Sequence, residues 1–155
     1  MKTTNLKTAA ITALFGIGLL AGCTNSTTNQ KTSDMKTLNL TQEWDKTFPQ
    51  SDKVNHSKVT FTNRYGITLA ADMYVPKKAT GKLPAIAVCG PFGAVKEQAA
   101  GLYAQTMAER GFLTVAFDPS YTGESGGEPR YVVSPDINTE DFSAAVDFLA
   151  TNDKV

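Results

Sequence analysis

The sequence has few cysteines, a single histidine and no excess of either charge. Its 155 residues include 2 Cys and 1 His, and 15 basic side chains balance 15 acidic ones. A balanced charge builds no basic stripe on which a nucleic-acid backbone could lie, so we predict no nucleic-acid partner. The length allows one domain at most.

Glycine motifs for nucleotides are also missing. Gly90 and Gly93 match neither the dinucleotide pattern nor the P-loop, in which a glycine precedes the lysine and Ser or Thr follows it. Lys96 has neither neighbour. We therefore predict no cofactor, and we assign no metal ligands.

The first residues have the pattern of an export signal. A positively charged start precedes an apolar run over residues 9–20, which is too short to span a bilayer comfortably. The run ends in Leu20-Ala21-Gly22-Cys23, which resembles the bacterial lipobox. The resemblance implies a signal peptide over residues 1–22 and a lipid on the thiol of Cys23, which would anchor the chain to a membrane of the cell envelope, on its periplasmic or extracellular face. An ordinary signal peptide is the alternative.

Residues 23–52 connect this signal to the fold. The stretch from Thr24 to Lys36 has almost no apolar side chain to offset the entropy of ordering, so it predicts a flexible tether. The apolar positions that follow allow a short helix or a strap lying on the domain, with Trp44 as a packing anchor; they are Leu38, Leu40, Trp44 and Phe48. With Cys23 carrying a lipid, Cys89 has no disulfide partner, and we interpret it as a small core residue.

Residues 53–155 predict an α/β fold. Alternating apolar residues indicate strands over 58–62 and 67–75, joined by a turn as an antiparallel hairpin. The apolar run 85–89 is too short for a helix and predicts a strand buried on both faces. A helix from Lys96 to Arg110, ended by Gly111, leads to a second buried strand over 112–117. These three elements form one βαβ unit.

Two amphipathic helices complete the predicted fold. The first is expected to bury a stripe made of Ala99, Leu102, Tyr103, Thr106 and Met107. The second is expected to begin at Asn138 or Thr139 and to bury Phe142, Ala145, Val146 and Leu149. Since ligands bind at the carboxyl ends of strands in open α/β sheets, the loops of interest are 90–95 and 118–130.

These segments together resemble the amino-terminal half of an α/β-hydrolase. The resemblance covers about Val54 to Val155 and is most specific in three runs, which are Gly90-Pro91-Phe92-Gly93-Ala94-Val95-Lys96-Glu97-Gln98, Ala116-Phe117-Asp118 and Gly123-Glu124-Ser125-Gly126-Gly127-Glu128-Pro129-Arg130. The runs resemble bacterial hydrolases close to dienelactone hydrolases and to Xaa-Pro dipeptidyl-peptidase-like esterases. The resemblance implies hydrolysis of small-molecule esters, or less readily of amide or peptide-like bonds.

The family's catalytic triad is expected beyond this sequence. In the resembled fold a Ser or Cys nucleophile follows the last helix found here, and the acid and histidine come later. The chain is thus expected to be truncated before the nucleophile strand, which would leave residues 86–89 as an unprotected hydrophobic edge. The part of the site that remains is the oxyanion hole, whose backbone donors we assign to Phe92 and Gly93, because Pro91 has no N–H.

Three side chains invite a catalytic interpretation that we do not favour. Ser125 fits Gly-x-Ser-x-Gly, but a nucleophile must lie on a sharp turn directly between strand and helix, and Glu128-Pro129-Arg130 follows instead. His56 has no sequence neighbour that could orient it as a base. Cys89 likewise lacks a nearby histidine.

Two other functions stay open at this point. The chain could be a non-catalytic surface lipoprotein that serves as a binding or scaffold module. A small flavodoxin-like cofactor binder is the third alternative, and it should retain flavin or nucleotide on purification.

Overall fold

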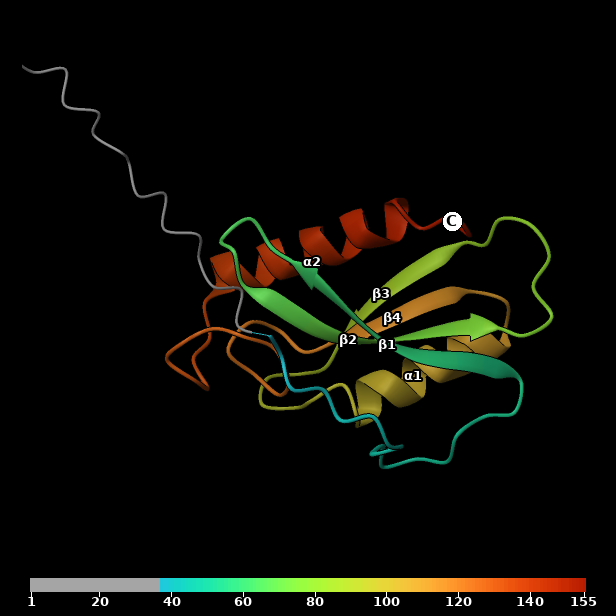
Figure 1. Ribbon diagram of the computed structural model, residues 1–155, viewed down its shortest axis with the longest axis horizontal. Helices are drawn as coiled ribbons and strands as arrows, with labels where there is room; N and C mark the ends of the chain where they lie inside the picture. The colour runs from blue at the N-terminus through green and yellow to red at the C-terminus, as the bar shows by residue number, and fades with distance from the viewer. Residues whose placement is uncertain (1–36) are drawn as a thin grey trace, which may run out of the picture. The chain divides into compact units, whose positions relative to one another are not determined.

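The computed structural model describes residues 37–155, which form a four-stranded sheet with one helix on each face (Figure 1). The predicted signal peptide, the predicted lipidation site at Cys23 and the predicted tether lie outside the described residues. Within residues 37–155, no helix is long and apolar enough to cross a membrane. The α/β class predicted from the sequence is confirmed.

The predicted hairpin is formed by β1 (Val54–Thr62) and β2 (Thr68–Pro76), which pair antiparallel over their whole length. The turn between them is built by Asn63, whose side-chain oxygen accepts the N–H groups of Tyr65 and Ile67, both at 3.0 Å. Side chains of β2 are buried on both faces because β2 lies inside the sheet.

The predicted βαβ unit consists of β3 (Ala85–Cys89), α1 (Ala99–Glu109) and β4 (Leu113–Phe117). The strands β3 and β4 are parallel, and the sheet order is β1-β2-β4-β3. All of β4 is buried, whereas every residue of β3 is only half-buried. The prediction that residues 85–89 are buried on both faces is therefore wrong here, because β3 is an edge strand of the sheet that residues 37–155 form.

The helix α1 buries a different face from the predicted one. Its small residues face the sheet, and Leu102 and Tyr103 are 47% and 53% exposed. The buried residues are Ala100, Gly101, Ala104, Gln105 and Ala108. Because the helix packs closely on Tyr74, which is fully buried, only small side chains fit between them. The helix begins at Ala99, since residues 96–98 form a turn.

The final helix, α2 (Pro135–Ala150), begins before the predicted cap at Asn138 or Thr139. Pro135 takes the first helical position, where its missing N–H is no loss. Ala145 and Leu149 are buried as predicted, but Phe142 and Val146 are 43% and 55% exposed. The stripe is rotated because α2 turns polar side chains inward as well, among them the fully buried Asp141.

The open edge of β3 predicts self-association of the 155-residue chain. Leu113 donates to the carbonyl of Pro84, so alternation along the strand points the backbone groups of Ile86 toward β4 and those of Ala87 away from the sheet. Ala87→Pro removes an outward donor without breaking the ladder, and we expect it to reduce concentration-dependent association in analytical ultracentrifugation. Ile86→Pro, which removes a ladder hydrogen bond, should instead lower the thermal midpoint. Equal association of Ala87→Pro and the parent chain would contradict this role for the edge.

Candidate functional site

The loops after β3 and β4 lie at the same edge of the sheet, because the two strands are parallel neighbours. They cover residues 90–98 and 118–134 and include both segments that the sequence marks as candidates. This edge is where the fold can place a site.

The loop after β3 is a tight turn. The N–H of Ala94 donates to the carbonyl of Pro91 at 3.0 Å, and Gly93 adopts the left-handed φ of +81° that such a turn needs. Phe92, at the tip, is 83% exposed. Within residues 37–155 the N–H groups of Phe92 and Gly93 donate to no protein acceptor. Both predicted oxyanion donors are thus available to a ligand.

The loop after β4 holds Ser125 in a structural position. Its side chain is 2% exposed, and its hydroxyl donates to the carbonyl of Asp118 at 2.7 Å and accepts from the N–H of Ala70 at 2.8 Å. The hydroxyl of Ser125 thereby links the backbone of β2 to the residue that follows β4. Nothing in this arrangement presents the hydroxyl to a substrate.

A buried lysine joins the two loops. The side chain of Lys96 is fully buried, and its ammonium lies 2.7 Å from Oδ2 of Asp118. The backbone N–H of Lys96 donates to the other oxygen of the same carboxylate at 2.8 Å. Gly123 passes so close that a Cβ there would lie 2.2 Å from Asp118 Oδ2, which leaves room only for glycine. Asp118 thus fixes the loop after β3 from the end of β4.

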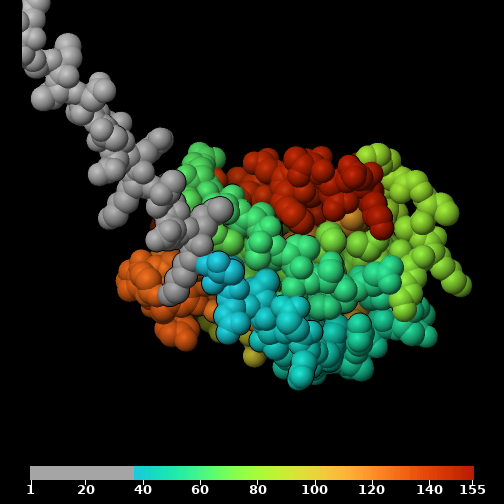
Figure 2. All heavy atoms as spheres, viewed as in Figure 1, coloured from blue at the N-terminus to red at the C-terminus, as the bar shows by residue number. Residues whose placement is uncertain are grey.

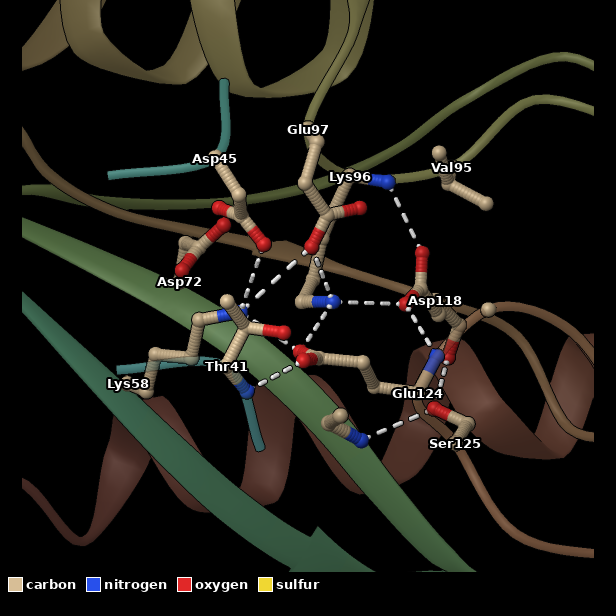
Figure 3. A network of polar contacts seen from close by, with 12 residues as sticks. Thr41, Asp45, Lys58, Asp72, Val95, Lys96, Glu97, Asp118, Glu124 and Ser125 are labelled. Atoms are coloured by element: carbon tan, nitrogen blue, oxygen red, sulfur yellow. Dashed lines mark hydrogen bonds and ion pairs between the residues drawn. The ribbon is translucent and has the colours of Figure 1, made fainter. Parts of the chain in front are cut away.

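Glu124 extends this contact into a network of charges (Figure 3). Its Oε2 accepts from Lys96 at 2.8 Å and from Lys58 of β1 at 2.5 Å, and its Oε1 accepts from the N–H of Thr41 at 2.6 Å. Burial would raise the pKa of Glu124, but the hydrogen bonds from Lys58 and Lys96 lower it to about 2. The carboxylate is therefore ionised at neutral pH and ties three separate segments together.

Burial and pairing act in opposite directions on the central pair. Burial alone would lower the pKa of Lys96, yet the carboxylates of Asp118, Glu124 and Glu97 raise it above the usual range of a lysine. Burial raises the pKa of Asp118, and the Lys96 ammonium opposes that rise. Each charged group is stabilised by its oppositely charged neighbours, which is what a buried ion requires.

Residues 37–50, which we call the strap, lie across this network. The strap forms no helix; it runs beside β1 and next to the loop after β4 (Figure 2). Thr47 donates its N–H to the carbonyl of Glu97 at 3.0 Å, and Phe48, 7% exposed, packs against Gly101 of α1. Trp44 donates to the carbonyl of Phe48 at 2.8 Å and packs against the core, as predicted for an anchor.

The histidine has an orienting partner that the sequence did not reveal. His56 Nε2 lies 2.8 Å from Oδ1 of Asp72, a buried residue of the neighbouring strand, and Lys46 of the strap lies 3.1 Å from Oδ2. The statement that nothing could orient His56 is therefore wrong, since strand pairing brings Asp72 beside it. The pKa of Asp72 is lowered, because the contacts with His56 and Lys46 outweigh its burial.

One group of carboxylates approaches the spacing of a metal site. Oxygens of Asp45, Glu97 and Glu124 lie within 4.8 Å of one another. The ammonium groups of Lys58 and Lys96 already lie among them, at 2.5 to 3.5 Å. These lysines supply the positive charge that a metal ion would bring.

Two small hollows open beside the candidate oxyanion turn. One, of about 160 Å³, lies over the carboxyl ends of β3 and β4, and the other, of about 200 Å³, lies between the turn and residues 131–133. Cys89 lines the first, and burial raises the pKa of its thiol to about 11. The thiol is protonated at neutral pH, which fits a small packing residue better than a nucleophile.

Comparison with known proteins identifies the family. The model of the X-Pro dipeptidyl-peptidase (S15) family matches residues 65–155, more than half of the chain. The chain belongs to the S15 family. Both loops of the candidate site lie inside the matched region of this S15 chain.

Similar proteins agree on an α/β-hydrolase fold. The uncharacterized protein PA2218 of Pseudomonas aeruginosa is 71% identical over 136 residues, 84% of this chain and 37% of that protein. Its crystal structure superposes with a TM-score of 0.75 at 76% identity over 76% of this chain and 37% of that one. The α/β-hydrolase GrgF from Penicillium sp. sh18 gives a TM-score of 0.56 at 29% identity, over 63% of this chain and 33% of that one.

A third relative carries an activity in its name. The thiohydrolase aneE of Aspergillus aculeatus is 34% identical over 99 residues, 64% of this chain and 30% of that protein. The S15 chain thus spans about a third of the length of the curated relatives it matches. It has the fold of the amino-terminal part of an α/β-hydrolase, as the sequence predicted.

Removing the buried lysine should destabilise the fold strongly. Lys96→Met keeps the length of the side chain but leaves Asp118 buried without its cation, and we expect a loss of about 3–5 kcal/mol in the free energy of unfolding by urea. Lys78→Met, at an exposed lysine in no ion pair within residues 37–155, should change it by less than about 0.5 kcal/mol. A loss for Lys96→Met below about 1 kcal/mol, typical of surface pairs, would refute the buried clamp.

Proposed function

We propose that the chain supplies the oxyanion-binding part of a hydrolase that cleaves acyl bonds. The observation that carries this proposal is the turn after β3, in which the N–H groups of Phe92 and Gly93 have no acceptor within residues 37–155. Backbone donors in this loop hold the negative oxygen of a tetrahedral intermediate in α/β-hydrolases. The Lys96–Asp118 contact supports the role, since it holds the turn from the neighbouring strand.

The substrate that we propose is a small ester or thioester. The S15 family match and the thiohydrolase aneE support hydrolysis of a bond to an acyl carbon. Amide or peptide bonds are a less favoured extension of the same chemistry. Neither Cys89 nor Ser125 has a nucleophile's surroundings, so we assign the Ser/Cys-Asp-His triad to sequence beyond residue 155.

The oxyanion role can be tested by deleting one donor. Phe92→Pro removes the N–H of residue 92 and suits the second position of the turn, whereas Phe92→Ala removes only the side chain. In the product of the complete reading frame that contains this chain, Phe92→Pro should lower kcat for p-nitrophenyl butyrate by about 10²–10³-fold, and Phe92→Ala by less than about tenfold.

Two results would count against the proposal. If Phe92→Pro retains the kcat of the parent protein, the turn is not the oxyanion site. If the complete product hydrolyses no ester or thioester, the non-catalytic binding module becomes the better interpretation.

We further propose that Cys23 carries a lipid that anchors the protein in the cell envelope. The support is the lipobox-like Leu20-Ala21-Gly22-Cys23 after a short apolar run. Several buried acyl chains, at about 0.8 kcal/mol per methylene, would hold such a protein on a membrane. In bacteria fed labelled palmitate, Cys23→Ser should abolish labelling and release the protein from the membrane fraction, and Cys89→Ser should change neither. Equal labelling of Cys23→Ser and the parent protein would disprove the anchor.

A further inference from the structure

The hollows beside the oxyanion turn have no charged lining. The two share Phe92, Gly93 and Thr122, together with Val132 and Val133. The remaining lining residues are also uncharged; they are Cys89, Gly90, Pro91, Val95, Phe117, Pro119, Ser120, Gly123, Tyr131, Asn138 and Phe142. A ligand placed here meets aromatic rings, aliphatic side chains and backbone, together with the neutral polar side chains of Ser120, Thr122 and Asn138.

Other hollows of the described chain differ in this respect. A larger one, of about 650 Å³, lies at the opposite end of the sheet and is lined by Lys53, Lys77, Lys78 and Arg110 with two acidic residues. Another, of about 490 Å³ beside α2, is lined by charged residues that include Arg64 and Glu140. These two hollows therefore have charged linings, unlike the two beside the oxyanion turn.

This lining is uncharged although its loops are rich in charge. Lys96, Asp118 and Glu124 point toward one another within the network (Figure 3). Arg130 donates its guanidinium to the backbone carbonyls of Gly123, Ser125 and Gly127. The Lys96, Asp118 and Glu124 charges are thus paired with one another, and the Arg130 guanidinium is held by backbone carbonyls, so none of the four lines the two hollows.

The same surface exposes apolar side chains. Phe92 and Tyr131 are 83% and 82% exposed, and Val133 is 49% exposed. Tyr131 adopts a left-handed φ of +61° and donates its N–H to the carbonyl of Tyr121 at 3.0 Å. Phe142 of α2, 43% exposed, closes the far side of the first hollow. When a hydrocarbon group of a ligand covers such apolar side chains, the burial of apolar surface favours binding, by about 25 cal/mol per Å².

We infer that the acyl part of the substrate is uncharged and apolar, an alkyl or aryl group seated on Phe92, Val132 and Val133. The inference rests on the proposed function and specifies its substrate class. A charged group next to the scissile bond, such as the free ammonium of a dipeptide, finds no counter-charge in the described lining and would lose its hydration. The part of the site formed by residues 37–155 therefore disfavours peptides with a free amino terminus, in contrast to the activity after which the family is named.

The test compares two p-nitrophenyl esters with six-carbon acyl chains on the product of the complete reading frame. The hexanoate is neutral, and the 6-aminohexanoate ends in an ammonium group. We expect kcat/KM for the hexanoate to be at least 100-fold higher than for the 6-aminohexanoate. It should also be at least tenfold higher than for p-nitrophenyl acetate. Val133→Asp should lower kcat/KM for the hexanoate at least tenfold through KM, while Tyr103→Asp, on the exposed face of α1, should match the parent protein.

A binding measurement separates this inference from the proposed function. Hexanamide and 6-aminohexanamide are titrated against the same protein, and the backbone amide signals of Gly93 and Val133 are followed by NMR. Selective shifts with hexanamide, abolished by Val133→Asp, support the inference even if no ester is hydrolysed.

Three results would overturn it. The first is equal hydrolysis of the two six-carbon esters, which leaves the proposed function intact. The second is equal binding of the two amides, or binding of neither. The third is a thermal midpoint for Val133→Asp well below that of Tyr103→Asp, which would show that other parts of the protein cover this surface.

Discussion

The buried contact between Lys96 and Asp118 is the interaction on which the candidate site depends. Asp118 accepts both the ammonium and the backbone N–H of Lys96, at 2.7 and 2.8 Å, so it positions the start of α1 as well as a charge. The candidate oxyanion turn lies between β3 and this contact, so both of its ends are tied to the sheet. A hydrophobic pair could fill the same space, but it could not hydrogen-bond to the backbone N–H of Lys96. Compared with such a pair, the ion pair adds control of backbone position more than it adds net stability, although removing only one partner is costly.

The strap connects the amino-terminal part of the described chain to this network. Thr41 binds Glu124 and Thr47 binds the carbonyl of Glu97, so a segment without helix or strand closes the network from outside. Lys58 connects the network to β1, the far edge strand of the sheet. The charges of this network lie away from the two hollows beside Phe92, whose lining is uncharged.

Elements with local signals could be predicted from the sequence, and elements that depend on a neighbour could not. The hairpin and the βαβ unit are confirmed because alternation, short apolar runs and Gly111 act within a few residues. The buried face of α1 was predicted wrongly, and that of α2 was predicted correctly for Ala145 and Leu149 but not for Phe142 and Val146. Spacing alone does not distinguish the Leu102 and Tyr103 stripe of α1 from its small-residue face, and the close approach of Tyr74 decides between them. The tight turn after β3 was located by its glycines, its role as an oxyanion site stays a prediction, and its lysine support was missed.

By itself the sequence determined the order of strands and helices and the two loops where a ligand could bind, since these follow from local backbone preferences. Only the tertiary structure decided the partners of the charged residues. Lys58 and Glu124 lie 66 positions apart, and Thr41 and Glu124 lie 83 apart, so no local pattern relates them. Those pairs form because strand pairing and the strap bring them together in a largely buried space, where an ion needs a counter-ion.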